Sequence, residues 1–265
     1  MGQTLILALV FLAISTLFSM IGMGGGILYV PILLFAGFTF KQAPAISLIL
    51  ISATSLAALF TFWRNRRVDW KLALVIDPPT DIMAFVGGYF SALVPEPVLR
   101  GILVAVLMVA GTLMLKGGAG KPVATSRPRG WWYWHREFNG ESYVVNLPLV
   151  LTATALIGIL SGMLGITGGI IKLPIMVLLC GVPMDIAVAT STVMVAVTAL
   201  SGLYGQALNQ AVDWRIGLVL AGAAVIGGLV GSRVSLNLDK KRLKRIFGVV
   251  VWLIALKMAW RLLAG

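Results

Sequence analysis

Cysteine and histidine each occur only once in this sequence of 265 residues, as Cys180 and His135. A disulfide framework needs paired cysteines, and a protein zinc site needs several cysteine or histidine ligands. We therefore expect neither a disulfide framework nor a bound metal, and the sequence gives no reason to expect another cofactor.

Charged residues are also scarce, at 11% of the chain, whereas 59% of the residues are hydrophobic. An ordinary soluble domain carries about 25% charged residues. A soluble protein of this composition could not cover its surface with polar groups, so the expected solvent is the lipid bilayer. The net charge of +12 lies mainly in short loops between apolar runs, as the positive-inside rule describes, and we do not expect a nucleic-acid partner.

Eight long apolar runs divide the chain. They cover residues 5–38, 44–63, 72–94, 98–115, 148–180, 186–207, 216–236 and 246–263. The polar stretch between the fourth and fifth runs separates a first membrane repeat (1–115) from a second (148–265). We interpret 116–147 as a cytoplasmic linker whose tryptophans anchor it at the level of the lipid headgroups.

The two halves match each other in sequence, which indicates an internal duplication of the kind found in secondary transporters. Adding 144 to a number in the first half gives its partner in the second. Val68-Asp69-Trp70 maps to Val212-Asp213-Trp214, and Ser47 maps to Ser191. With an offset of 143, the glycine-rich segment that begins at Gly22 maps to the one that begins at Gly165.

Equivalent loops of the halves differ in charge. Loop 64–71 has four basic residues and one acidic residue, whereas its partner 208–215 has one of each. Loop 239–245 has five basic residues and one acidic residue, and its partner 95–101 has one of each. Basic loops stay on the cytoplasmic side, so equivalent loops are predicted to lie on opposite sides of the membrane. The halves are therefore predicted to be inverted-topology repeats.

The first apolar run of each half, 5–38 or 148–180, is too long for one membrane span and too short for two. We predict that each run is a re-entrant or broken helical hairpin with its tip at the glycines. The expected fold is an all-α polytopic membrane protein with two inverted repeats, each a hairpin plus three transmembrane helices. Both termini are then predicted to lie outside.

The hairpin tips are the first candidate site. Glycine permits close backbone approach, and a broken helix offers N–H groups to an anion. We expect the two tips to meet near the middle of the membrane around one anion. The alternative is simple packing of small residues between helices. The tip residues predicted to bind the substrate are Gly24, Gly25, Gly26, Thr167, Gly168 and Gly169.

Five further residues extend this candidate site. Ser47 and Ser191 are predicted either to bind the anion or to form hydrogen bonds between helices. Lys172, inside the second hairpin, could attract the anion or form a structural ion pair. Asp77 and Asp81, four residues apart, are candidates for coupling to a proton or cation, or for pairing with Lys172 or another basic residue.

The segment Gly22-Met-Gly-Gly-Gly-Ile-Leu-Tyr-Val-Pro31 with Ala43-Pro-Ala-Ile-Ser47, and its repeat Gly165-Ile-Thr-Gly-Gly-Ile-Ile-Lys-Leu-Pro174 with Ala187-Val-Ala-Thr-Ser191, resemble the TauE/SafE sulfite exporter family. The resemblance covers nearly the whole chain. It implies transport of sulfite, or of another small sulfur-containing or organic anion, across the bacterial inner membrane.

The sequence therefore predicts a secondary transporter that moves a small anion by alternating access, coupled to a proton or sodium gradient. The alternatives are an anion channel or the membrane subunit of a larger transport system. An intramembrane enzyme is not expected, because Asp77 and Asp81 form the one paired-acid group within the apolar runs and no histidine or cysteine cluster accompanies them.

Overall fold

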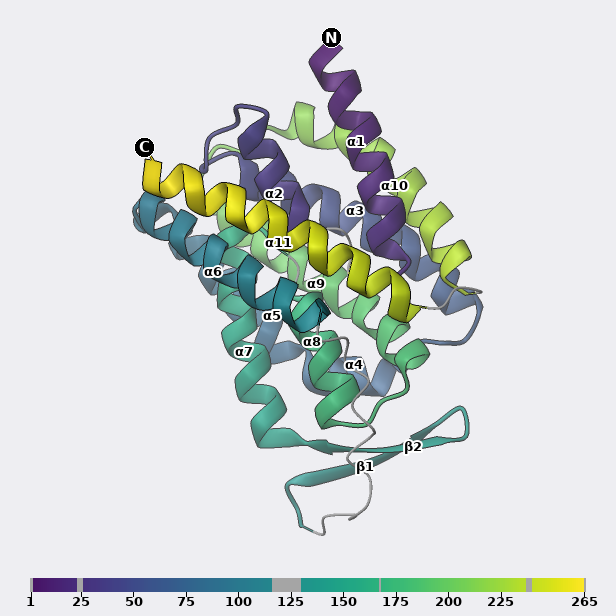
Figure 1. The fold of residues 1–265 in the computed structure, drawn as a ribbon. Coiled ribbons are helices and arrows are strands. Elements are labelled where there is room, and N and C mark those ends of the chain that lie inside the picture. The colour runs from purple at the N-terminus through teal and green to yellow at the C-terminus, as the bar shows by residue number, and fades with distance from the viewer. Residues whose placement is uncertain (1, 23–25, 116–129, 167, 237–239, 265) are drawn as a thin grey trace.

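The computed structural model describes residues 2–22, 26–115, 130–166, 168–236 and 240–264, and helices make up most of this part of the chain (Figure 1). The first half contains α1 (Gly2–Ser19), α2 (Gly26–Phe35), α3 (Ala43–Arg64), α4 (Trp70–Ile76), α5 (Pro78–Phe90), the 3-10 turn η1 (Ser91–Leu93) and α6 (Glu96–Leu115). The second half contains α7 (Leu147–Leu164), α8 (Gly169–Pro174), the π-helical η2 (Ile175–Leu179), α9 (Met184–Asn209), α10 (Trp214–Ser235) and α11 (Lys240–Ala264).

These helices coincide with the predicted apolar runs. Within the described residues, five helices are long and apolar enough to cross a membrane: Ala43–Arg64, Glu96–Leu113, Leu147–Leu164, Met184–Asn209 and Trp214–Ser235. A helix of 20 residues is about 30 Å long, which is the thickness of the hydrocarbon core. The protein is therefore a helical, multi-pass membrane protein.

The helix that starts at Trp70 is interrupted at Asp77, whereas its sequence partner α10 runs unbroken from Trp214 to Ser235. Pro78 and Pro79 directly follow Asp77. Proline has no N–H for the helical ladder and disfavours helical conformation in the residue before it. The interruption separates α4 from α5 and lies inside the apolar run.

Residues 147–180 form a helical hairpin. Helix α7 ends at Gly165, which has a left-handed backbone with φ of 65°, and the chain returns through α8 and η2. The backbone N–H of Val144, just before α7, donates to the carbonyl of Cys180 at a distance of 3.2 Å. The hairpin thus begins and ends at the same place. In the first half, α1 and α2 form the equivalent pair, with Gly22 at a φ of 71°.

The helices of the two halves pack mainly against each other. Helix α1 packs on α10, and its counterpart α7 packs on α5. Helix α3 packs on α10 and α9 packs on α5, while α3 and α9 lie together in the middle and α6 pairs with α11. Small residues permit the close contacts: a side chain at Gly87 would meet Ile159 of α7, and one at its partner Gly231 would meet Thr16 of α1.

The linker differs from the all-α expectation. It contains two antiparallel strands, β1 (Tyr133–Phe138) and β2 (Glu141–Asn146), joined at Asn139 and Gly140 (Figure 1). Both turn residues have positive φ, 51° and 79°. An Asn-Gly pair between β-forming residues favours a tight hairpin turn. This signal is present in the sequence, but our prediction took account only of the aromatic residues around it.

Candidate functional site

A buried network of charged and hydroxyl groups lies between the halves. The ammonium group of Lys172 on α8 donates to Asp77 Oδ1 and, over 3.0 Å, to Thr198 Oγ1 on α9. Thr198 Oγ1 donates in turn to Asp81 Oδ1 on α5 at 2.8 Å. The side chain of Lys172 is 1% exposed and that of Asp77 is 7% exposed. We call these four residues the central cluster.

The broken helix explains how two acids enter one cluster. Asp77 lies at the break between α4 and α5, and Asp81 lies one turn further along, so both carboxylates point to the same side. The ion pair that the sequence offered as the alternative role for Lys172 and Asp77 is present in the structure. With both acids ionised, the cluster carries one negative charge in excess, and an unpaired charge is costly away from water.

A neutral counterpart of the central cluster occupies the repeat-related position. Tyr29 is the sequence partner of Lys172, and its hydroxyl lies 3.1 Å from that of Thr54, the partner of Thr198. The residues equivalent to Asp77 and Asp81 are Ala221 and Val225. Our sequence analysis did not single out Tyr29. The aligned segments could have revealed it, since tyrosine stands where the second repeat has lysine.

Thr54 and Thr198 lie near the middle of their helices, as residue 12 of 22 in α3 and residue 15 of 26 in α9. These two helices are antiparallel, because the backbone N–H of Asp69, just beyond the end of α3, donates to Thr190 near the start of α9. The two related clusters therefore lie near the middle of the bundle.

Ser47 and Ser191 hold the hairpin turns. Ser47 Oγ donates to the carbonyl of Gly165 at 2.6 Å, and Ser191 Oγ donates to the carbonyl of Gly22 at 2.8 Å. Each serine thus holds the hairpin of the other half. The sequence left two roles open for these serines, anion binding and hydrogen bonding between helices. The structure contains hydrogen bonds of the second kind, each from a serine to a turn.

The turns at Gly22 and Gly165 lie at different levels of the central helices, whereas the meeting of the glycine tips near the middle of the membrane stays a prediction, because Gly24, Gly25 and Thr167 lie outside the described residues. Gly165 packs on Pro44 at the start of α3, and Gly22 packs on Val188 near the start of α9. Leu48, beside Ser47, lies level with Gly202 of α9, which is 11 residues beyond Ser191. At 1.5 Å per residue, the two turns are roughly 16 Å apart along the helices. One small ion cannot touch both.

The remaining tip residues divide into two groups. Gly24, Gly25 and Thr167 lie outside the described residues. Gly26, Gly168 and Gly169 are buried at the starts of α2 and α8. Gly168 has an ordinary φ of −63°. Among the described residues of the two turns, Gly22 and Gly165 have the left-handed backbone that favours glycine.

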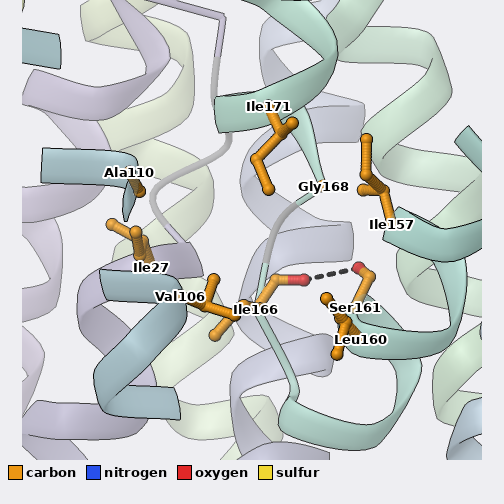
Figure 2. A pocket seen from close by; sticks show the side chains of 9 residues that line it. All are labelled: Ile27, Val106, Ala110, Ile157, Leu160, Ser161, Ile166, Gly168 and Ile171. Carbon is orange, nitrogen blue, oxygen red and sulfur yellow. Dashed lines mark hydrogen bonds between the residues drawn. The ribbon is translucent and has the colours of Figure 1, made fainter. Parts of the chain in front are cut away.

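A small cavity beside Gly168 is almost entirely apolar (Figure 2). It lies between the second hairpin, α2 and α6, with Ile27, Val106 and Ile157 among its lining residues. The hydroxyl of Ser161 is already used, because it donates to the carbonyl of Ile166 at 2.5 Å. The described residues that line this cavity therefore offer an anion no free side-chain donor.

A second ionic group fixes the linker to the start of α4. Asp69 caps α4 by accepting from the N–H of Leu72 at 3.1 Å. Its carboxylate also accepts two 3.0 Å hydrogen bonds from Arg136 of β1 and one from the hydroxyl of Tyr143 on β2. Burial alone would raise the pKa of Asp69, but the bonds from Arg136, Tyr143 and Leu72 outweigh it and hold this pKa below its ordinary value.

The arrangement of paired charges inside an apolar, helical bundle is typical of membrane transporters. The sequence model of the family described as "Sulfite exporter TauE/SafE" matches residues 6–258. The chain belongs to the TauE/SafE family. It is accordingly a membrane transporter and not an enzyme. No group of three or more potential metal ligands occurs among the described residues of this TauE/SafE protein.

Relatives of this TauE/SafE chain include three proteins named as probable membrane transporter proteins. YunE of Bacillus subtilis (strain 168) is 28% identical over 96% of this chain and 97% of its own length. A protein of Xylella fastidiosa (strain 9a5c) is 26% identical over 91% of this chain and 89% of its own length. YfcA of Escherichia coli (strain K12) is 27% identical over 89% of this chain and 82% of its own length. The comparison with solved structures gives no match.

Proposed function

We propose that this protein is a secondary transporter that moves sulfite, or a related small sulfur-containing or organic anion, across the bacterial inner membrane. Two inverted repeats alternate in exposing the substrate to the two sides, and a proton or cation gradient drives the cycle. Both termini lie outside, and the linker lies in the cytoplasm.

The charges of the loops and the directions of the helices support the inverted arrangement of the two halves. The basic loop 64–71 adjoins the linker, since Asn139 Nδ2 donates to the carbonyl of Arg66. Helix α7 starts beside the strands at the bottom of the view, whereas its partner α1 starts at the top (Figure 1). The exchanged bonds of Ser47 and Ser191 and the exchanged packing of α1 and α7 are what a twofold relation between the halves would produce.

The observation that carries the proposal is the excess acid of the central cluster. Lys172 can neutralise one of the two carboxylates, and Asp77 is its direct partner. A proton or sodium ion at Asp81 would remove the remaining charge. An anion that reaches Lys172 would compete with Asp77 for the ammonium group, so binding of the anion and of a coupling cation at the acids would favour each other.

The predicted tip residues keep a place in this proposal. The segments 24–26 and 167–169 end at the first residues of α2 and α8, the helices that carry Tyr29 and Lys172. Their backbone N–H groups could meet the anion on its way to Lys172. Ser47 and Ser191 then act by fixing the two turns in position.

Flux into liposomes tests this function. Purified protein should accumulate sulfite, or another anion from a panel, against its concentration gradient when a pH or sodium gradient is imposed. Asp81→Asn should retain anion exchange but lose the response to the gradient. Glu141→Gln, an exposed acid on β2, is the matched control and should behave as wild type.

Two results would contradict the proposal. Unaltered gradient-driven uptake by a folded Asp81→Asn variant would remove Asp81 from coupling. Flux that only dissipates gradients, and never concentrates an anion, would favour a channel over a transporter.

A further inference from the structure

A cavity of about 450 Å³ opens at the end of the bundle that holds the start of α3 and the end of α9. Its polar lining includes Lys41, Gln42, Glu96, Asn209 and Gln210. Pro44 and Met163 also line it, and Pro44 is the residue on which the turn at Gly165 packs. The cavity thus reaches the second hairpin turn from the end of the bundle opposite the linker.

The repeat relates this cavity to the other end of the bundle. Lys41 corresponds to Asp185, and Ala211 corresponds to Arg67. At the linker end, Arg67 Nη1 and Asp185 Oδ2 form an ion pair at 3.1 Å that joins the segment after α3 to the start of α9. At the cavity end, Ala211 has no charged group to offer Lys41. The same two positions are therefore bridged at one end of the bundle and not at the other.

The Arg67–Asp185 ion pair is weak enough to form and break repeatedly, as a reversible closure requires. The side chains of Arg67 and Asp185 are 40% and 53% exposed. Exposed pairs of this kind change an equilibrium by about two- to five-fold, because water screens them and their ordering costs side-chain entropy. An ion pair of this strength shifts the equilibrium between two conformations, and both conformations remain populated.

We propose that the cavity is the outer vestibule by which the anion reaches the hairpin turn at Gly165, and that the Arg67–Asp185 pair closes the equivalent route on the inner side. This inference rests on the proposed transport function and adds an access site and a conformational state to it. Lys41 attracts a small anion into the vestibule electrostatically. The acid in the lining, Glu96, accepts hydrogen bonds from Arg100 at 2.9 and 2.5 Å, which offsets its charge.

The test installs the missing ion pair at the outer end. Ala211→Asp gives Lys41 a carboxylate in the position that mirrors Arg67 and should bias the vestibule toward closure. The reporter is labelling of Met163→Cys, in a Cys180→Ser background, by a membrane-impermeant thiol reagent added from outside to proteoliposomes of determined orientation. Ala211→Asp should slow labelling about two- to five-fold. Ala211→Asn is the matched uncharged control, and adding Lys41→Gln to Ala211→Asp should restore the rate.

Breaking the Arg67–Asp185 pair on the inner side should, like Ala211→Asp, favour closure of the outer vestibule. Asp185→Asn removes the inner ion pair and should therefore slow outside labelling of Met163→Cys. Equal labelling of the Ala211→Asp and Ala211→Asn variants, or no outside labelling of Met163→Cys at all, would overturn the proposal. Labelling requires no transport, so this inference can fail while the flux assay succeeds. Conversely, correct labelling without concentrative flux would reject only the transport function.

Discussion

Substitution of Lys172 by methionine keeps the length of the side chain and removes the ammonium group that faces Asp77 and Thr198. Removing one partner of a buried ion pair costs about 3–5 kcal/mol of unfolding free energy, because the other charge loses its counter-ion. Lys172→Met leaves the carboxyl groups of Asp77 and Asp81 without a cation, so with both acids ionised the net charge of the cluster changes from −1 to −2. We therefore expect a loss in the upper part of that range.

Asp77→Asn should cost less. The ammonium group keeps its 3.0 Å bond to Thr198, which donates to Asp81. The cluster then contains one cation and one anion, and we expect a loss near about 3 kcal/mol. The double variant Lys172→Met/Asp77→Asn returns the net charge to its wild-type value of −1. It should regain most of the stability that Lys172→Met loses, since removing both partners of a buried pair is often close to neutral.

Denaturant unfolding in detergent micelles, followed by circular dichroism, measures the unfolding free energies of these variants and so their order of stability. Tyr29→Phe is the matched control at the repeat-related position, where it removes a hydrogen bond between neutral groups worth about 0.5–1.5 kcal/mol. A Lys172→Met variant within about 1 kcal/mol of wild type would refute the buried pair. A double variant no more stable than Lys172→Met would show that the two side chains do not interact.

Three further predictions concern the turns, the linker and the topology. Gly165→Ala should destabilise the protein by at least about 1–2 kcal/mol more than Gly168→Ala, since only Gly165 has a left-handed backbone, and equal unfolding free energies would contradict this. The lowered pKa of Asp69 means that its stabilising effect is present at neutral pH and is lost as the pH falls below the ordinary aspartate range. Asp69→Asn should therefore remove this part of the acid-induced loss of stability, and parallel melting curves against pH would exclude it. Single cysteines at Glu96 and Asn209 should label from outside and one at Asn65 should not, whereas equal labelling at Asn65 and Glu96 would exclude inverted repeats.

The helices could be predicted from the sequence because hydropathy alone dictates them in a bilayer. Each apolar run contains one helix or a broken pair of helices, and the hairpin at 147–180 follows from a length that fits neither one span nor two. The strands β1 and β2 escaped because the linker was interpreted by its aromatic residues. The Asn139-Gly140 turn between them is a local signal that the sequence already contains.

The candidate site could be predicted only in part, since the sequence does not specify how deep each hairpin reaches. Lys172, Asp77 and Asp81 stand out as charges in apolar runs, and the sequence even offered the correct pairing as one alternative. The glycine clusters suggested a single meeting point of the tips, and this stays a prediction. The structure separates the turns because each packs on the first turns of a central helix from the other half, at Pro44 or at Val188. Such contacts between distant segments leave no periodic trace in the sequence.

The two halves have diverged where the duplication placed equivalent polar groups, and electrostatics gives a reason. A second charged cluster at Tyr29 and Thr54 would place another lysine and two more acids near the middle of the bundle, and the excess charge there would double from −1 to −2. Each buried charge requires a partner or a proton. The tyrosine keeps the hydrogen bond to its threonine without any charge. Helix α10, which has Ala221 and Val225 in place of the acids, also remains unbroken, whereas the helix that carries Asp77 and Asp81 is interrupted by Pro78 and Pro79. The interruption and the charges therefore occur together in one half, whereas α10 of the other half stays continuous and packs on α1 and α3.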